Sequence, residues 1–356
     1  MTARFPADLL SRSAEEASRL VALVYLDEAG RAQRRLGDPL DAEALHDFRV
    51  GLRRLRSCTR AYRPQLKGSV SRRMRRRLRD LTRATNPGRD TEVQLAWLEQ
   101  QTTRLGPGDT QGLAWLTGRL EGQKHEALEL ITNDLARRFT KVATRLRPRL
   151  QSFRVEVRTG RGQDRPSFGK VTGGLIQTQG QRLAEKLSAV RSQDDVAEAH
   201  AARIAAKRLR YVLEPLSRRV PGAKGLVQRL KELQDILGHL RDRHVLADEI
   251  AASLTGLARG TSSQPSAAEI GLTSLRQLAA ADAGAMFAEF QARWATGTAA
   301  RFFHQANELG RRLMEPEGQL TDVAGPPDPL AQHSVDPDIS ERKEIREGRV
   351  LAWKSS

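Results

Sequence analysis

The chain has 356 residues, enough for one large or two medium domains, and its single cysteine, Cys58, excludes an internal disulfide. Its formal net charge is +17, and arginine outnumbers lysine by 50 to 10. A charge excess of this size indicates a polyanionic partner, such as a nucleic acid, polyphosphate or an anionic membrane surface.

Periodic apolar residues predict that nearly all of the ordered chain is helical, with proline and glycine at the breaks. In the first half we predict helices over 7–36, 41–63, 69–85, 90–105 and 109–147. In the second half we predict helices over 168–191, 195–214, 223–240, 242–258 and 266–314. Both sets run in the same order, from a long helix through a basic helix to a very long final helix, so we expect two similar halves.

The predicted domain organisation follows from these two sets of helices. Residues 1–150 form a first helical repeat, 151–166 a connection with brief strand-like alternation near 153–157, and 167–316 a second helical repeat. Residues 317–356 are rich in proline and mixed charges, so we expect a poorly ordered tail.

A basic signature occurs in the second predicted helix of each half, with corresponding positions 154 residues apart. It reads His-x-x-Arg-x-x-x-Arg-Arg-x-Arg over 46–56 and again over 200–210, where Lys207 replaces one arginine. At helical spacing, most of these residues form a row of cations beside an apolar face. Like charges one turn apart repel each other, and few acids lie among them. A solvated face is the simpler interpretation of one such helix, but the duplication favours an anionic ligand.

A second basic helix follows the first signature, and its arginines at 72, 76, 79 and 83 form one stripe. The corresponding part of the second half is milder and includes Lys231. The halves match again at Arg89-Asp90 and Arg241-Asp242, where we expect each pair to open a helix and each aspartate to cap it or orient the arginine.

These patterns predict an anion-binding site built from both halves. The predicted contacts are His46, Arg49, Arg53, Arg54, Arg56, Arg60, Arg72, Arg76, Arg79, Arg83, Arg89, His200, Arg203, Lys207, Arg208, Arg210, Lys231 and Arg241. The two histidines either contact the anion or form structural hydrogen bonds at the start of their helices, and both roles stay open.

Three segments carry a resemblance to a known family: HDFRVGLRRLR at 46–56, HAARIAAKRLRY at 200–211 and LKELQDILGHLRD at 230–242. They resemble the CHAD family, the conserved histidine α-helical domain, over roughly residues 10–316. The resemblance implies an all-α fold of two pseudo-symmetric four-helix-bundle-like repeats with a basic central channel or groove between them. It also implies binding of inorganic polyphosphate, often at polyphosphate granules, through the histidines, arginines and lysine of both signatures.

The two halves also depart from each other. Thr85-Asn86-Pro87-Gly88 stands where the second half has Leu237-Gly238-His239-Leu240, so the third helix of the first half should end earlier. Glu214 corresponds to Arg60, which makes the two cationic rows unequal.

No arrangement typical of catalysis or metal binding stands out. The stretch 162–170 lacks the spacing of a phosphate-binding loop, no His-Glu-x-x-His motif occurs, and Cys58 is expected to be a buried thiol. The tunnel metalloenzyme domain that often accompanies the CHAD family is also missing its alternating Glu-x-Glu-x-Lys strand. We therefore expect no enzyme, no cofactor and no metal.

The expected function is non-catalytic binding of inorganic polyphosphate. Nucleic acid is the second candidate partner, but only Phe48, Tyr62 and Tyr211 lie in the duplicated helices to stack on bases. A polyphosphate-cleaving enzyme is the third candidate. No apolar run is long enough to span a membrane and the stretch 20–26 is too short for a signal peptide, so we expect a cytoplasmic protein, with polyphosphate granules as a candidate location. The sequence does not indicate an oligomeric state.

Overall fold

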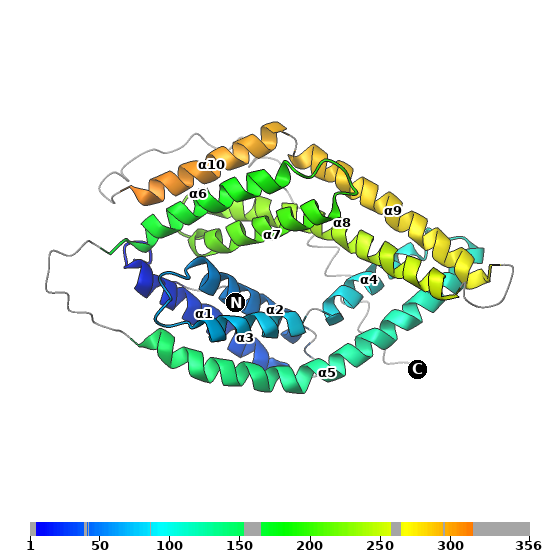
Figure 1. Cartoon of the computed structure of the whole chain (residues 1–356), viewed down its shortest axis with the longest axis horizontal. Coiled ribbons are helices and arrows are strands. Elements are labelled where there is room, and N and C mark those ends of the chain that lie inside the picture. The colour runs from blue at the N-terminus through cyan, green and yellow to red at the C-terminus, as the bar shows by residue number, and fades with distance from the viewer. Residues whose placement is uncertain are drawn as a thin grey trace, which may run out of the picture. The chain divides into compact units, whose positions relative to one another are not determined.

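The structure, a computed structural model, describes residues 5–38, 41, 43–85, 87–152, 165–257, 265–294 and 296–315. The all-α prediction is confirmed, since helices and short 3-10 turns are the regular elements of these ranges and no strand occurs among them (Figure 1). Residues 1–316 form one compact unit. The strand-like stretch 153–157 and the tail 317–356 lie outside the described residues.

The first half contributes five helices and one short 3-10 turn to the described part of the chain. They are α1 (Ala14–Arg35), α2 (Ala44–Ala61), α3 (Arg72–Ala84), α4 (Pro87–Gln101), η1 (Pro107–Asp109) and α5 (Thr110–Gln151). The second half follows with its own helices and one further turn. They are α6 (Phe168–Leu187), α7 (Val196–Leu213), η2 (Glu214–Leu216), α8 (Ala223–Leu257), α9 (Ala267–Trp294) and α10 (Thr296–Met314).

Serine side chains begin three of these helices. The hydroxyl oxygens of Ser13, Ser71 and Ser167 accept hydrogen bonds from the backbone N–H three residues later, at 3.2–3.3 Å. Each bond satisfies one backbone donor that has no partner inside the helix. These caps therefore help to set where α1, α3 and α6 begin.

The third helix of each half behaves differently. α3 ends at Ala84 and α4 begins at Pro87, which confirms that the first half breaks early; proline fits a first helical turn because its missing N–H is not needed there. In the second half, the predicted break at residue 241 is wrong, because α8 continues without interruption from Ala223 to Leu257. Asp242 therefore lies inside a helix and does not cap one.

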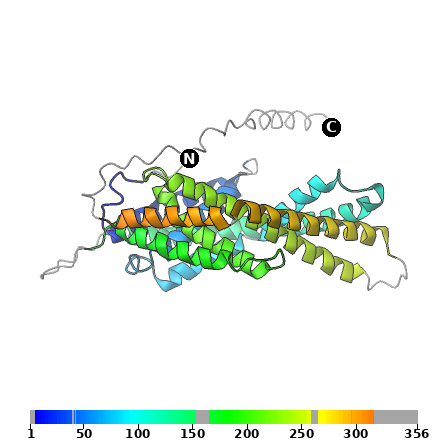
Figure 2. The same cartoon turned by 90° about the horizontal axis from the view of Figure 1, so that it is seen from above.

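Three apolar clusters hold the body together. The first is built mainly by α1, α2, α3 and the end of α5, and the second mainly by α6, α7, the first part of α8 and α10. The third joins α4, the beginning of α5, the second part of α8 and α9, so both halves contribute to it. Figures 1 and 2 both show α9 running along the second part of α8. The pseudo-twofold relation between the halves stays a prediction.

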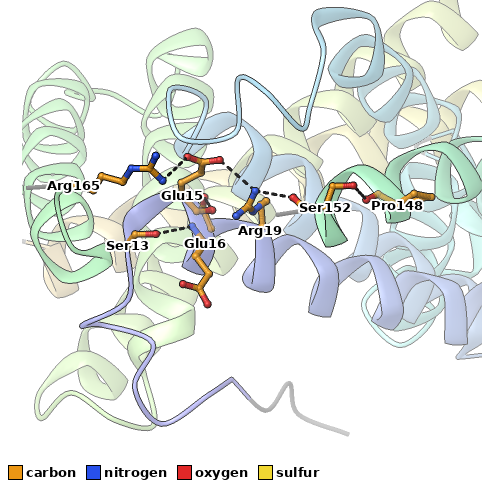
Figure 3. A network of polar contacts seen from close by, with 8 residues as sticks. Ser13, Glu15, Glu16, Arg19, Pro148, Ser152 and Arg165 are labelled. Carbon is orange, nitrogen blue, oxygen red and sulfur yellow. Dashed lines mark hydrogen bonds and ion pairs between the residues drawn. The ribbon is translucent and has the colours of Figure 1, made fainter. Parts of the chain in front are cut away.

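The start of the chain is tied to the start of α6. The backbone N–H of Ala14 donates to the carbonyl of Pro166 at 3.0 Å, and that of Phe168 donates to the carbonyl of Arg12 at 2.8 Å. On the other side of α1, the buried Arg19 donates to the carbonyl of Ser152, just after α5, at 3.0 Å (Figure 3). These bonds bring the beginnings of both halves to one place.

A buried contact between the end of α2 and the start of α6 links the two halves. The hydroxyl groups of Tyr62 and Thr172 share a buried hydrogen bond of 3.0 Å, and the Tyr62 ring stacks on Phe168 with centroids 4.9 Å apart. Just beyond this contact α2 contacts α7 directly, so the helices that carry the two basic signatures meet.

Candidate anion-binding site

The two signature helices cross with opposite chain directions. Arg54, in the middle of α2, bonds Glu214 just after the end of α7, whereas Arg60, near the end of α2, lies close to Arg208 in the middle of α7. This crossing gathers cations from both halves around one contact. They divide into three groups by their neighbours.

The first group is the central cluster, formed by Arg53, His200, Arg203, Lys207 and Arg241. Burial, followed by the positive charges of Arg203, Arg53, Arg210 and Arg241, lowers the pKa of Lys207 to about 7. Keeping Lys207 charged among these cations therefore costs a substantial amount of free energy.

The polar atoms of the central cluster are incompletely satisfied. Within the described part of the chain, the Nε of Arg53 and the Nδ1 of His200 are buried and have no hydrogen-bond partner. Burial and the charges of Arg241, Arg203 and Lys207 lower the pKa of His200, which favours the neutral imidazole. The cluster thus combines buried nitrogens that lack hydrogen-bond partners among the described residues with several positive charges.

Arg203 is positioned by the backbone of α8. Its Nε donates to the carbonyl of Gln234 at 3.4 Å, and a Cβ built on Gly238 would lie 3.2 Å from the same nitrogen. Glycine at 238 therefore gives the guanidinium room against the helix. Burial lowers the pKa of Arg203, although the nearby carboxylate of Asp242 acts in the opposite direction.

The second group is the basic flank, formed by Arg56, Arg60, Arg182 and Arg208. Burial and the charges of Arg60, Arg182 and Arg56 lower the pKa of Arg208, and burial and the charge of Arg182 lower that of Arg60. None of the four forms an ion pair with a carboxylate among the residues that the structure describes. Arg79 and Arg83 extend the flank along α3, because their charges act on Arg56.

The third group is the neutral flank, formed by Glu28, Arg54, Arg210 and Glu214. Arg54 lies 3.2 Å from Glu28 and 3.0 Å from Glu214, and the Nε of Arg210 lies 3.4 Å from Glu214. Burial opposes the charge on Arg54, but the two carboxylates outweigh it and raise its pKa. The guanidinium of Arg210 also lies over the Tyr211 ring, 4.8 Å from the centroid. Acids of the protein already neutralise both arginines here.

Arg49 was predicted as an anion contact, and the structure gives it an internal role. Its side chain is only 5 % exposed, its Nε donates to the carbonyl of Thr85 at 3.0 Å, and its Nη1 lies 3.2 Å from Glu92. Arg203 makes the corresponding bond to α8, so the first arginine of each signature ties its helix to the next basic helix.

Other predicted contacts lie outside these groups. His46, Arg72 and Arg76 are exposed, and Arg79 has Asp80 at 3.5 Å. Lys231 lines a pocket beside Arg54 and Glu214. The side chain of Arg89 lies outside the described residues.

Sequence reasoning missed Arg182, which lies on α6, away from the duplicated signature. Its counterpart 154 residues earlier is Glu28, so the charge is reversed between the halves. A comparison of charges at that spacing beyond the signature would have found it. The buried thiol at Cys58 was predicted and is confirmed; burial raises its pKa.

Within the described ranges, none of the helices is both long enough and apolar enough to cross a bilayer. The expectations of a cytoplasmic location and of granule association stay predictions.

Two solved structures have a fold similar to that of this chain. The crystal structure of the CHAD domain from the plant Ricinus communis is similar, with a TM-score of 0.59, 21% sequence identity, and coverage of 86% of this chain and 96% of that chain. PptA from Streptomyces chartreusis is similar with a TM-score of 0.62 and 18% identity, over 80% of this chain and 99% of that chain. No curated protein matches the chain.

The CHAD domain profile matches residues 18–251, which include both basic signatures, α2, α7 and most of α8. A match over this share of the chain, together with the same fold in the two solved structures, settles the resemblance read from the signatures. The chain belongs to the CHAD domain family.

Proposed function

We propose that this protein binds inorganic polyphosphate at the central cluster and the basic flank. The observation that carries the proposal is the meeting of α2 and α7, which holds cations from both halves close together. The four arginines of the basic flank form no ion pair with a carboxylate among the described residues. Such mutual repulsion costs stability in the free protein, and an anion with closely repeated charges would relieve it. The family resemblance points to the same ligand.

The chemistry of the two groups suits a chain of phosphates. A guanidinium donates two parallel hydrogen bonds to two oxygens of one phosphate, and arginine supplies most of the cations here. A long chain can contact the central cluster and the basic flank at once, whereas one phosphate cannot, so affinity should rise with chain length.

The aromatic side chains near the site favour polyphosphate over nucleic acid. Phe48 and Tyr62 are buried in the core, and Tyr211 is buried beneath Arg210. None of the three can offer a free ring for a base, whereas proteins that bind single strands without sequence preference stack bases on exposed aromatics.

We also propose that the site binds without cleaving. Glu28 and Glu214, the carboxylates of the neutral flank, are engaged by arginine and are poorly placed to act as general bases. The carboxylate of Asp242, near the central cluster, faces the charge of Arg203. Release of phosphate from long chains by the pure protein with Mg²⁺ would contradict this part of the proposal and leave the binding itself intact.

The first experiment is calorimetry with polyphosphates of defined length at two salt concentrations. We expect affinity to rise with length and to fall steeply with salt, because bound cations release counterions from the polyanion. In a competition assay, polyphosphate should displace DNA or RNA far more readily than the reverse. Equal displacement in both directions would instead indicate a general polyanion or nucleic-acid site.

A charge-reversal variant tests the location of the site. Arg49 is not a suitable target, because charge reversal would place a second carboxylate beside Glu92 in a buried contact. We expect Arg53→Glu, Arg56→Glu and Arg60→Glu together to abolish binding of long chains while helical content stays unchanged. The matched control is Lys141→Glu, Arg145→Glu and Arg149→Glu, which removes the same charge from an exposed stripe of α5. Equal loss in both variants would refute the site.

A further inference from the structure

The basic flank and the neutral flank occupy corresponding positions in the two halves. Counted 154 residues apart, Arg54 corresponds to Arg208 and Arg56 to Arg210. The other two pairs differ in charge: Glu28 corresponds to Arg182, and Arg60 to Glu214. Two reversals therefore separate a flank with no net charge from one with four cations.

The reversals change what each flank can accept. In the neutral flank, the carboxylates of Glu28 and Glu214 take hydrogen bonds from Arg54 at 3.2 and 3.0 Å. A phosphate approaching Arg54 would compete with these acids and be repelled by them. In the basic flank no acid intervenes among the described residues. Within the described ranges, a buried Nε without a hydrogen-bond partner occurs in both flanks, on Arg208 and on Arg210, so the acids are what distinguishes them.

We propose that a bound polyphosphate chain leaves the central cluster on one side only, over the basic flank, and that Arg182 of α6 is a binding residue on this path. The inference rests on the proposed function. It adds a direction to the bound chain and a contact from a helix that carries no part of the signature. Arg79 and Arg83 of α3, whose charges act on Arg56, continue the path beyond α2.

A pocket beside the neutral flank offers the competing route. Its lining includes Arg218, Arg219 and Lys231, together with Phe5 and Tyr25. Glu214 and the paired Arg54 also line it, and Arg219 already donates to the backbone carbonyl of Phe5. A chain on this route would meet an acid and an apolar wall, so we assign the path to the other flank. Lys231 serves as the probe of the rejected route.

Three single variants that each remove one positive charge test the proposal. They are Arg182→Gln, Lys186→Gln one turn further along α6, and Lys231→Gln in the pocket; all three side chains are exposed. Titrated with long-chain polyphosphate, Arg182→Gln should bind at least about tenfold more weakly, as expected for loss of a hydrogen bond to a charged group. The other two should stay within about twofold of the wild type, since only long-range charge is lost.

The outcomes separate the inference from the function that it rests on. If the wild type does not bind polyphosphate, the proposed function fails. If the wild type binds and the triple reversal at 53, 56 and 60 abolishes binding, the function stands. In that case, equal affinities of Arg182→Gln and Lys186→Gln for long-chain polyphosphate would overturn the one-sided path. A loss of affinity in Lys231→Gln as large as that in Arg182→Gln would overturn it as well. Thermal melts of all three variants show whether the fold is kept.

Discussion

Two regions of the body hold arginines whose neighbours differ in charge. In the central cluster and the basic flank at the α2–α7 crossing, arginines lie mostly among other cations. In the distal bundle of α4, α8, α9 and the start of α5, they face acids and aromatic rings: Arg104 lies 2.9 Å from Asp282, and Arg119 lies 3.0 Å from Glu249. The guanidinium carbon of Arg243 lies 4.8 Å from the centroid of the Trp97 ring.

The comparison shows which feature distinguishes the proposed site from the distal bundle. Arg243 also has a buried nitrogen, Nη1, without a hydrogen-bond partner in the described part of the chain, as Arg53 and Arg208 have. An unsatisfied nitrogen therefore does not distinguish the two regions. The sign of the neighbouring charges does, because Asp282 and Asp242 favour the charged form of Arg243, whereas Arg60 and Arg182 disfavour that of Arg208.

Removal of Asp282 would make the distal bundle resemble the crossing. Its two carboxylate oxygens accept hydrogen bonds from Trp97 Nε1 at 2.7 Å and Arg104 Nη1 at 2.9 Å, and its charge also favours that of Arg243. We expect Asp282→Ala to lower the free energy of unfolding by about 2 kcal/mol, chiefly because it leaves the buried indole N–H of Trp97 without its acceptor. Urea denaturation measures the change.

The control for that variant is Glu289, two helical turns further along α9. Glu289 pairs with Arg293 at 2.9 Å, but both side chains are more exposed than Asp282. Glu289→Ala should cost less than about 1 kcal/mol, as is usual for surface pairs. Similar losses in the two variants would show that the distal bundle does not depend on its charge pairing.

The sequence predicted the shared features of the halves better than their differences. Helical periodicity was enough to predict an all-α chain, and the signature spacing placed Arg53 and Lys207 at corresponding positions of the two halves. They could not show that Arg49 turns toward Glu92, because a helical row assigns the same face to a structural arginine and a binding one. Nor could they show that α8 continues without a break, because residues 241 and 242 suit either a helix start or a helix interior.

Arg182 shows the other limit. A signature search looks for residues that recur, and Arg182 matters because it does not recur: the acid at 28 becomes a base at 182. Only the packing of α6 beside α7 brings this arginine to Arg60 and Arg208. Its role depends on contacts between helices that local patterns do not encode.

Substitution of Lys207 should change the free energy of unfolding in the opposite direction to substitution of Asp282. Its pKa of about 7 in the folded protein lies below the ordinary 10.5, so its charge destabilises the fold in full below pH 7. The unfolded state binds more protons than the folded state between these two values, so the penalty shrinks as pH rises. We expect Lys207→Met to stabilise the protein by about 2 kcal/mol at pH 6 and by less at pH 9.

The same variant should bind long polyphosphate more weakly, because it removes a cation from the central cluster. Stability and affinity would then change in opposite directions, as expected where a strained site is kept for its ligand. Unfolding curves at both pH values, with titrations at pH 6, test both parts. A Lys207→Met protein less stable than the wild type at pH 6 would show that the lysine supports the fold.

The pH dependence of binding sharpens the difference between the two regions. A bound polyanion favours the charged form of Lys207, so binding above pH 7 must be coupled to proton uptake. Affinity should therefore be highest below pH 7 and fall about tenfold by pH 8.5, an effect of about one pKa unit. Lys207→Arg keeps its charge and should show a flatter profile, and an identical slope in both proteins would remove Lys207 from the site.

The smallest predicted effect concerns the edge of the basic flank on α3. The charge of Arg83 acts on Arg56, whereas the exposed Arg76, seven residues earlier on α3, is not among the charges that lower the pKa of Arg56. We expect Arg83→Gln to weaken long-chain binding about threefold and Arg76→Gln less than twofold, within the range of exposed single charges. Parallel titrations at low salt measure both, because screening hides effects of this size. A larger loss from Arg76→Gln than from Arg83→Gln would show that the bound chain follows the exposed arginine stripe of α3 that the sequence predicted. The binding site would then not be confined to the partly buried cations at the α2–α7 crossing.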